Sequence, residues 1–132
     1  MDDGKKIRVL VVEDTPFYRE ILSRMLRDLG VEVVSARDGE RALEKIKNEK
    51  NISAVITDWM MPNMDGIAFV KHIRNIPGME KTPILMVTGH DTSQAKIAQA
   101  AGVNEFLHKP VSLKELVQKF NMIGIAVSPK KI

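Results

Sequence analysis

The sequence predicts an α/β fold in which a doubly wound, five-stranded parallel sheet carries helices on both faces, in a (βα)5 arrangement. The first observation is that five short runs rich in Val and Ile are spaced along the chain. The second is that each run is followed by a segment whose apolar residues recur with helical spacing. The third is that residues 9–12 and 84–87 are apolar without alternation, which is typical of strands covered on both faces.

The strands and the first helix can be placed from local signals. The first helix should begin after Thr15 at Pro16, because threonine is a good N-cap residue and proline is favoured at the first helical position. It should end at Gly30, since glycine readily adopts the left-handed conformation that follows a helix. The expected strands are residues 7–12, 32–36, 54–57, 83–88 and 103–108. The expected inward stripe of this helix is Phe17, Ile21, Leu22, Met25 and Leu29.

The remaining helices are expected at residues 39–49, 66–75 and 92–101, and from Ser112 onward. Asp38 is the candidate cap of the second helix, and Ser112 with Glu115 forms a capping box at the fifth. The fourth helix offers Ile97 as its one large inward residue, beside alanines at 95, 98 and 101. Because it buries little apolar area, we expect this helix to be held weakly.

Length and composition indicate a single soluble domain. The 132 residues can bury one core, which we assign to residues 1–125, with residues 126–132 as a short tail or the start of a linker. There is no cysteine, and no apolar run approaches the ~18–20 residues that span a bilayer. The N-terminus lacks signal-peptide features, so a cytoplasmic location without membrane insertion is expected. The net charge of +3 is too small to indicate nucleic-acid binding.

Five polar side chains follow or end four of the expected strands. Glu13 and Asp14 follow the first strand, Asp58 follows the third, Thr88 ends the fourth and Lys109 follows the fifth. Because ligands of open α/β sheets bind beyond the carboxyl ends of the strands, these groups should converge. Clustered carboxylates need a cation, and oxygen ligands without His or Cys suit Mg²⁺, with Mn²⁺ as an alternative. A carboxylate can attack phosphorus, so the site suits phosphoryl transfer, with Lys109 supplying charge and Thr88 a hydrogen-bond donor.

Each of these residues also has a simpler explanation. Asp58 could be a turn residue, and Glu13 or Asp14 could favour a helix N-terminus electrostatically. Thr88 could be an ordinary strand residue, and Lys109 a solvated charge. The position of all five after the appropriate strands favours a shared site.

The same residues lie in motifs that resemble those of bacterial two-component response-regulator receiver domains of the chemotaxis-regulator type. The motifs are Val12-Glu13-Asp14, residues 58–66 (Asp-Trp-Met-Met-Pro-Asn-Met-Asp-Gly), Val87-Thr88-Gly89 and residues 106–110 (Phe-Leu-His-Lys-Pro). The resemblance covers about residues 7–124 and implies the flavodoxin-like sheet order 2-1-3-4-5.

The resemblance implies a role for each site residue. Asp58 matches the phosphoacceptor, and Lys109 matches the lysine that contacts the phosphoryl group. The bond from Lys109 to Pro110 is implied to be cis. The implied metal ligands are Glu13, Asp14, Asp58 and the backbone carbonyl of Met60. Glu13 stands where many relatives carry aspartate.

The resemblance also implies a switch. On phosphorylation Thr88 would move toward the phosphoryl oxygens, and Phe106, where tyrosine is frequent in relatives, would turn inward. The output face would comprise the fourth helix, the fifth strand and the fifth helix. Met60 and His90 would tune the phosphoryl lifetime; the apolar Met60 cannot orient water, which predicts slow self-dephosphorylation. The imidazole of His90 could hydrogen-bond water, or His90 could be an exposed loop residue.

The implied partners are a cognate histidine kinase or phosphotransfer protein and a downstream protein that binds the output face. We expect a monomer or a phosphorylation-dependent dimer, with no direct contact to nucleic acid. The expected role is signalling and not that of an enzyme: the domain assists only its own phosphorylation and dephosphorylation.

Several alternatives remain open. The chain could be a stand-alone receiver or a receiver cut from a larger multidomain regulator or hybrid kinase. A Mg²⁺-dependent phosphatase fits less well, because such enzymes typically carry Asp-x-Asp after the first strand and this chain has Glu13-Asp14-Thr15. A flavodoxin-like FMN binder also fits less well, since these carboxylates would repel a phosphate.

Overall fold

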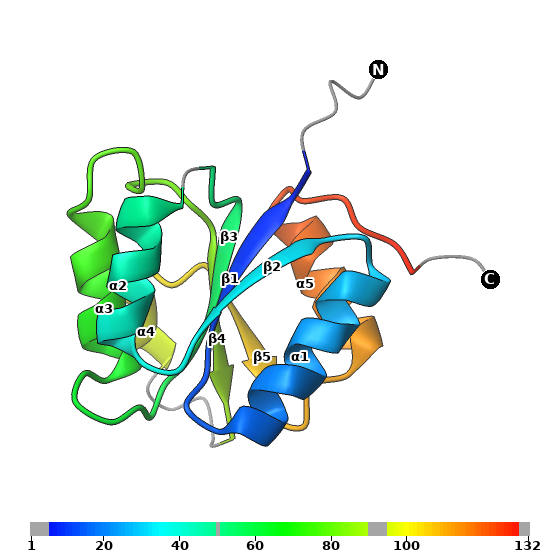
Figure 1. The fold of residues 1–132 in the computed structure, drawn as a ribbon, viewed down its shortest axis with the longest axis horizontal. Coiled ribbons are helices and arrows are strands. Elements are labelled where there is room, and N and C mark those ends of the chain that lie inside the picture. The colour runs from blue at the N-terminus through cyan, green and yellow to red at the C-terminus, as the bar shows by residue number, and fades with distance from the viewer. Residues whose placement is uncertain (1–5, 50, 90–94, 130–132) are drawn as a thin grey trace.

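The computed structural model describes residues 6–49, 51–89 and 95–129, and strands alternate with helices throughout them (Figure 1). The predicted elements are all present, with ends that differ from the expected ones by a few residues. The strands are β1 (Arg8–Val12), β2 (Glu32–Ala36), β3 (Ala54–Asp58), β4 (Ile84–Thr88) and β5 (Glu105–His108). The helices are α1 (Pro16–Asp28), α2 (Gly39–Asn48), α3 (Gly66–Arg74), α4 (Ala95–Ala101) and α5 (Leu113–Met122).

The five strands form one parallel sheet in the order β2-β1-β3-β4-β5, which confirms the expected order. Figure 1 shows α1 and α5 on one face of the sheet, and α2, α3 and α4 on the other. Residues at alternate positions of a strand point to opposite faces of the sheet. Each central strand therefore packs against a helical layer on both of its faces. This explains why the central strands are apolar along most of their length.

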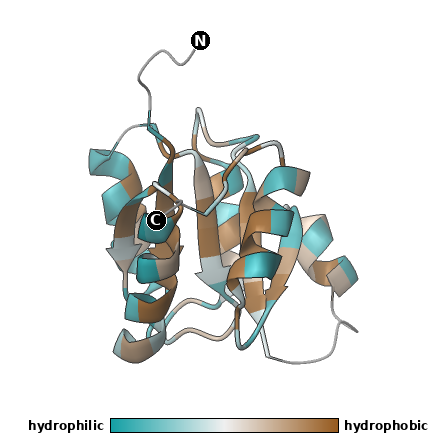
Figure 2. Cartoon of the chain, turned by 90° about the vertical axis from the view of Figure 1, so that its right-hand side faces the viewer, coloured by the Kyte–Doolittle hydropathy of each residue, from teal (hydrophilic) through white to brown (hydrophobic). Residues whose placement is uncertain are grey.

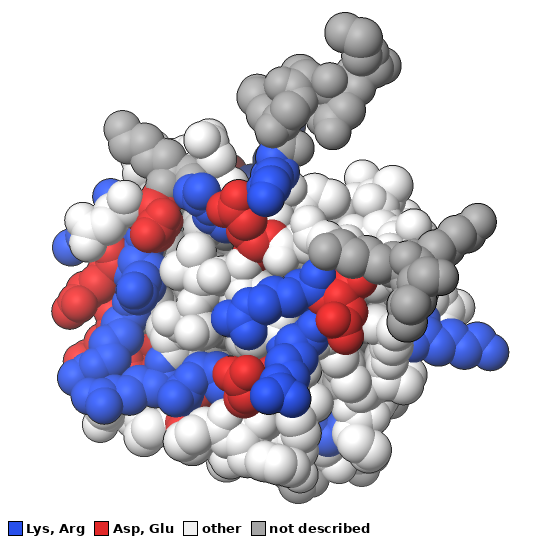
Figure 3. Space-filling model, turned by 45° about the vertical axis from the view of Figure 1, so that its right-hand side comes forward, with Lys and Arg blue, Asp and Glu red and all other residues white. Residues whose placement is uncertain are grey.

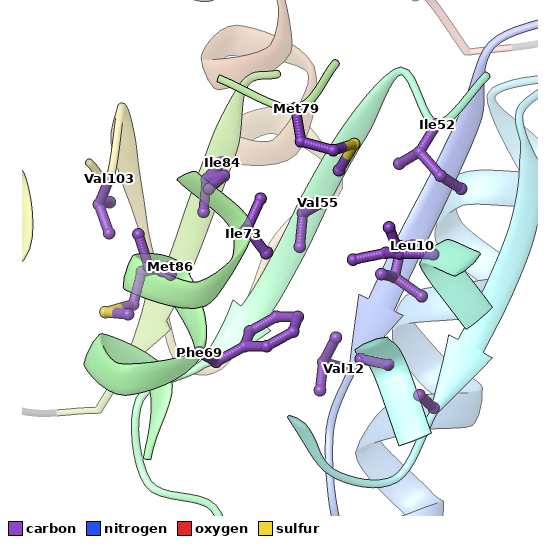
Figure 4. Packing of buried hydrophobic residues seen from close by; sticks show 14 of the residues in the cluster. Leu10, Val12, Ile52, Val55, Phe69, Ile73, Met79, Ile84, Met86 and Val103 are labelled. Carbon is purple, nitrogen blue, oxygen red and sulfur yellow. The ribbon is translucent and has the colours of Figure 1, made fainter. Parts of the chain in front are cut away.

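Two hydrophobic cores result, one on each face of the sheet. Leu10 and Val12 of β1 belong to the core under α2, α3 and α4, part of which is drawn in Figure 4. Val9 and Val11 belong to the core under α1 and α5. Figure 2 shows the matching pattern, with apolar colour concentrated on the strands and polar colour on outer helix faces. Among the described residues, no helix is both long and apolar enough to cross a membrane.

Most of the predicted helix ends are confirmed, with two corrections. The Asp38 carboxylate accepts a hydrogen bond from the Arg41 amide at 2.8 Å, and Gly30 has φ 79° after α1. Thr15 occupies the N-cap of α1, but its side chain makes no capping hydrogen bond. At α5 the Ser112 hydroxyl accepts from the amide of Glu115. The Glu115 carboxylate does not close a capping box, because it instead accepts from the amide of His108 at 3.1 Å and contacts the His108 imidazole at 2.8 Å.

Two large apolar side chains that were predicted to face inward are exposed. Phe17 is 67% exposed at the start of α1, where Leu22 and Leu26 carry the buried stripe. Ile97 is 57% exposed on α4, whereas its neighbour Ala98 is completely buried. The described part of α4 therefore buries even less apolar area than the sequence suggested.

Arg74 joins three segments at the amino ends of β4 and β5. Its guanidinium donates to the carbonyl oxygens of Met79 at 3.0 Å and Thr82 at 2.7 Å in the α3–β4 loop. It also donates to the carbonyl of Gly102 at 2.7 Å and the Asn104 Oδ1 at 3.0 Å. Burial lowers the pKa of Arg74 from its ordinary value. The side chain thus links the end of α3 to the turn that follows α4, at the end of the sheet opposite the candidate site.

Candidate functional site

The five side chains singled out in the sequence all lie at the carboxyl edge of the sheet. Asp58 and Thr88 are the last residues of β3 and β4, and Glu13 and Lys109 directly follow β1 and β5. The ligand oxygens of Glu13, Asp14 and Asp58 lie within 4.8 Å of one another. The two strand ends that carry these carboxylates are adjacent because β1 and β3 are neighbours in the sheet.

Asp58 lies at the centre of the cluster and is held from two sides. Its side chain is 9% exposed, and its Oδ2 accepts a hydrogen bond from Lys109 Nζ at 3.1 Å. Its Oδ1 accepts from the amide of Trp59 at 2.8 Å. The same Lys109 Nζ lies 3.5 Å from Glu13 Oε1, so one ammonium neutralises part of the charge of two buried carboxylates.

The electrostatics of the cluster are unbalanced. Burial, followed by the negative charge of Asp58, raises the pKa of Glu13 from 4.5 to about 6, although hydrogen bonding to Thr15 and the charge of Lys109 oppose the increase. Burial alone would lower the pKa of Lys109, but its hydrogen bond to Asp58 and the charges of Asp58 and Glu13 outweigh burial and raise it. One ammonium therefore faces three carboxylates, and the excess negative charge favours a cation.

The loop after β1 fixes the acidic pair. Glu13 Oε2 accepts a hydrogen bond from the amide of Thr15 at 2.9 Å, which turns the chain into α1. The carbonyl of Glu13 accepts from the Arg19 guanidinium at 2.9 Å, one turn into that helix. Asp14 is exposed and leaves its carboxylate at the open side of the cluster.

The loop after β3 depends on Gly66. Its amide donates to the carbonyl of Trp59 at 2.7 Å, so the start of α3 lies against the end of β3. A Cβ at this position would lie 2.5 Å from the carbonyl oxygen of Asp58 and 3.0 Å from the Cα of Trp59. Only glycine fits this approach, and Asp65 then caps α3 by accepting from the amide of Ala68 at 2.8 Å.

The remaining residues predicted for the site are Thr88, Phe106, Met60, Pro110 and His90. Thr88 is buried at the end of β4. Phe106 is also buried, at 9% exposure, within the core under α2, α3 and α4, so its side chain already faces inward. Met60 is 68% exposed, and the bond from Lys109 to Pro110 is cis. His90 lies outside the described residues.

Tyr18 is a neighbour of the site that sequence reasoning missed. Its ring centroid is 5.1 Å from Lys109 Nζ, within the range of a cation–π contact. Tyr18 and Lys109 also line a mostly apolar cavity of about 80 Å³ between α1 and the β5–α5 loop. The sequence carried no signal for this contact, because a tyrosine early in a helix has no required direction. Tyr18 therefore helps to hold the ammonium that reaches Asp58.

This arrangement suits a hard divalent cation and a carboxylate nucleophile. The cluster offers oxygen ligands without His or Cys, which are the ligands that Mg²⁺ prefers, and Mg²⁺ needs few of them. Asp58 has a counter-cation at one oxygen and an amide donor at the other, which are suitable groups for stabilising charge on an attached phosphoryl group.

Comparison with known proteins gives a consistent result. The family described as the response regulator receiver domain matches residues 9–121. The chain is 36% identical over 122 residues to the chemotaxis protein CheY-3 of Vibrio cholerae serotype O1, covering 91% of this chain and 93% of that protein.

Solved structures agree in fold. The structure of the chemotaxis protein CheY4 of Vibrio cholerae superposes with a TM-score of 0.85 at 33% identity, covering 90% of this chain and 99% of that one. The receiver domain of the sensor histidine kinase PA1611 from Pseudomonas aeruginosa PAO1, which has a magnesium ion coordinated in its active-site cleft, gives a TM-score of 0.81 at 28% identity. This match covers 91% of this chain and 99% of that one.

Proposed function

The chain belongs to the response regulator receiver domain family, and we propose that Asp58 is the residue on which it accepts a phosphoryl group. It is homologous to the CheY chemotaxis regulators and works in phosphoryl-accepting two-component signalling. The observation that carries the assignment of Asp58 is its position: a buried carboxylate at the end of a central strand, between the acidic pair and the Lys109 ammonium.

The proposed reaction is a direct transfer. A carboxylate oxygen of Asp58 attacks the phosphorus of a phosphohistidine, or of a small acyl phosphate, and forms the new O–P bond of an aspartyl phosphate. The P–N or P–O bond of the donor breaks, and its electron pair leaves with the imidazole or the acylate. Lys109 already donates to Asp58 and is placed to neutralise the phosphoryl oxygens, while the Trp59 amide stays on the second carboxylate oxygen.

Mg²⁺ fits the donor set of this site. Glu13, Asp14 and Asp58 are the carboxylates that would hold it, with the Met60 carbonyl as a further ligand, and Mn²⁺ is the alternative ion. When bound, the ion supplies positive charge that offsets the carboxylates and the incoming phosphoryl group. The raised pKa of Glu13 supports this assignment, because it reflects the burial of this carboxylate and, after burial, the negative charge of Asp58.

The output of the domain is proposed to be the face formed by α4, β5 and α5. Phosphorylation adds about −1.5 to −2 charges at one point, and Thr88 is the hydroxyl at the end of the neighbouring strand. Ala98 is the only buried residue in the described helix α4, so moving that helix disturbs little packing. Since Phe106 is already inward, we propose that phosphorylation stabilises this orientation, by shifting an existing equilibrium.

The partners that follow from this proposal are a histidine kinase or phosphotransfer protein as donor and a downstream protein on the output face. The domain itself is proposed to act as a signalling element and not as an enzyme. A Mg²⁺-dependent phosphatase is less well supported, because the loop after β1 presents Glu13-Asp14-Thr15 and not Asp-x-Asp.

The test is incubation with acetyl phosphate and Mg²⁺, read by intact mass. The wild-type chain should gain the mass of one phosphoryl group, and Asp58→Asn should gain none. Asp65→Asn is the matched control, because Asp65 lies in the same loop and serves as the cap of α3; it should gain the phosphoryl mass. A gain in Asp58→Asn, or no gain in wild type with this donor and with histidine kinases, would refute the assignment.

The proposed switch has its own measurement. Beryllofluoride with Mg²⁺ mimics the phosphoryl group, and amide NMR shifts should change in residues 95–120 as well as around Asp58. Shifts confined to the loops that hold the three carboxylates would contradict a switch of the α4–β5–α5 face.

A further inference from the structure

A basic groove lies along the outer edge of the sheet, away from the α4–β5–α5 face. It has a volume of about 530 Å³ and lies between α1 and α2, with the end of β2 as its floor. Four of its lining residues are basic, and Glu44 is the one acidic residue among them. The basic residues are Arg19, Arg37, Arg41 and Lys45.

The charge of this groove is only partly neutralised by its surroundings, because one buried carboxylate, Asp38, lies beside two of its basic side chains. The Asp38 carboxylate is buried and already accepts from the Arg41 amide and, at 2.9 Å, from the Arg41 guanidinium. Arg37 is 61% exposed and lies 4.0 Å from the same carboxylate. Figure 3, which brings the α1 and β2 side forward, shows Lys and Arg side chains gathered at the left and lower left of this face, with Asp and Glu side chains beside them.

The floor of the groove is the end of β2, an edge strand that pairs on one side only among the described residues. β2 pairs with β1, and it is the first strand in the sheet order. The amide of Glu32 donates to Ile7, and the carbonyl of Ala36 accepts from Glu13, so residues 32, 34 and 36 direct their main-chain groups toward β1. The amides and carbonyls of Val33 and Ser35 therefore point outward, where an added strand can pair with them.

We propose that this groove binds an extended, acidic segment of a partner protein, which adds to the sheet as a strand beside β2. Main-chain hydrogen bonds to Val33 and Ser35 would give the segment its direction, and its carboxylates would meet the basic side chains on both walls. The Arg41 guanidinium is already held by Asp38, so little side-chain freedom is lost when an anion binds it.

Other occupants fit the groove less well. A second copy of the chain pairing through β2 would bring two sets of basic side chains together, and like charges repel. A nucleic acid would meet the basic side chains but would leave the outward amides and carbonyls of Val33 and Ser35 without strand partners. Basic residues can also simply protect an edge strand from pairing. In that case an acidic segment would not bind.

The experiment uses a short synthetic peptide of alternating Glu and Val, titrated into the ¹⁵N-labelled full chain and followed by NMR and by fluorescence anisotropy. Binding should weaken with salt, and the amides of Val33, Ser35 and Arg37 should shift. The charge-reversal pair Arg37→Glu and Lys45→Glu should weaken binding by about tenfold. Both side chains are exposed, and the variant should still accept phosphate from acetyl phosphate, which shows that it is folded.

Matched controls separate the proposal from general charge attraction. The pair Arg24→Glu and Arg27→Glu changes the net charge equally but lies on exposed positions of α1 outside the groove, and it should leave binding unchanged. A peptide N-methylated at alternate residues should bind weakly, because it cannot complete the strand pairing.

Equal weakening by both charge-reversal pairs, unchanged binding of the methylated peptide, or no shift in β2 would overturn the proposal. Tighter binding of a single-stranded oligonucleotide, or self-association through β2 without peptide, would also overturn it.

Discussion

Replacing Glu13 by glutamine should stabilise the metal-free protein at alkaline pH. The Glu13 side chain is 6% exposed and lies 3.5 Å from Lys109 Nζ, so its charge is buried with incomplete compensation. Glutamine keeps an oxygen that can accept from the amide of Thr15, the hydrogen bond that Glu13 makes at 2.9 Å. The substitution therefore removes the charge while preserving the main local contact.

The size and sign of the effect follow from the pKa of Glu13. Burial and the charge of Asp58 raise this pKa from 4.5 to about 6 in the folded protein. Between these values the folded state binds the proton more tightly than the unfolded state, so stability decreases as pH rises through this window. At 1.36 kcal/mol per pH unit, the difference amounts to about 2 kcal/mol above pH 6 and vanishes below pH 4.5. Glu13→Gln should recover up to this amount at pH 8 and little at pH 4.

Urea denaturation of both proteins at several pH values measures this difference, because contributions from titrating groups that do not interact with Glu13 cancel between them. In thermal melts, a stability difference of about 2 kcal/mol corresponds to a rise of roughly 8 °C in Tm. Glu40→Gln, an exposed carboxylate in the first turn of α2, is the control and should change stability by only a few tenths of a kcal/mol. Saturating Mg²⁺ should stabilise the wild type more at pH 8 than at pH 5. The same Mg²⁺ should stabilise Glu13→Gln less than it stabilises the wild type. A variant that is not more stable at pH 8, or whose difference from wild type does not change with pH, would refute the reasoning.

Three further changes test other parts of the structure. Gly66→Ala should destabilise the fold by about 1–3 kcal/mol in urea denaturation, because the new Cβ would lie 2.5 Å from the Asp58 carbonyl oxygen; a gain in stability, as alanine gives in an unconstrained helix, would contradict this. Arg74→Met should destabilise by about 2–4 kcal/mol through the loss of several partly buried hydrogen bonds, whereas the exposed Arg24→Met should change stability by less than about 0.5 kcal/mol. Met60→Asn should shorten the phosphoryl lifetime, since the 68% exposed Met60 cannot orient water; a wild-type lifetime of seconds, unchanged in the variant, would count against this.

The alternation of strands and helices was predictable because each strand carries its signal locally. The central strands are apolar at most positions, and both of their faces are covered by helices. The order of the strands was not encoded in that pattern and came from the family resemblance. On helices the hydrophobicity of a residue was a misleading guide, because it does not show whether that residue faces the sheet.

Phe17 and Ile97 illustrate this limit. Phe17 precedes the buried Leu22 by five residues, which is about 1.4 helical turns, so it points well away from the buried stripe. On α4, Ile97 and Ala98 are adjacent and cannot both face the sheet; the structure buries the alanine. Hydrophobicity favoured the larger side chain, but the space between α4 and the sheet admits the smaller one.

The site was predictable to the extent that the chain directs its residues to strand ends. Glu13, Asp58 and Lys109 converge because parallel strands end at one edge, and this requires no knowledge of side-chain contacts. The pairing of these charges could be learned only from the three-dimensional structure. There the Lys109 ammonium contacts two buried carboxylates and also lies over the ring of Tyr18. Because that ammonium does not offset the full negative charge, the metal-free protein is destabilised, and a bound cation can relieve this destabilisation. Cation binding and stability are therefore coupled through the same carboxylates that the proposed phosphoryl transfer requires.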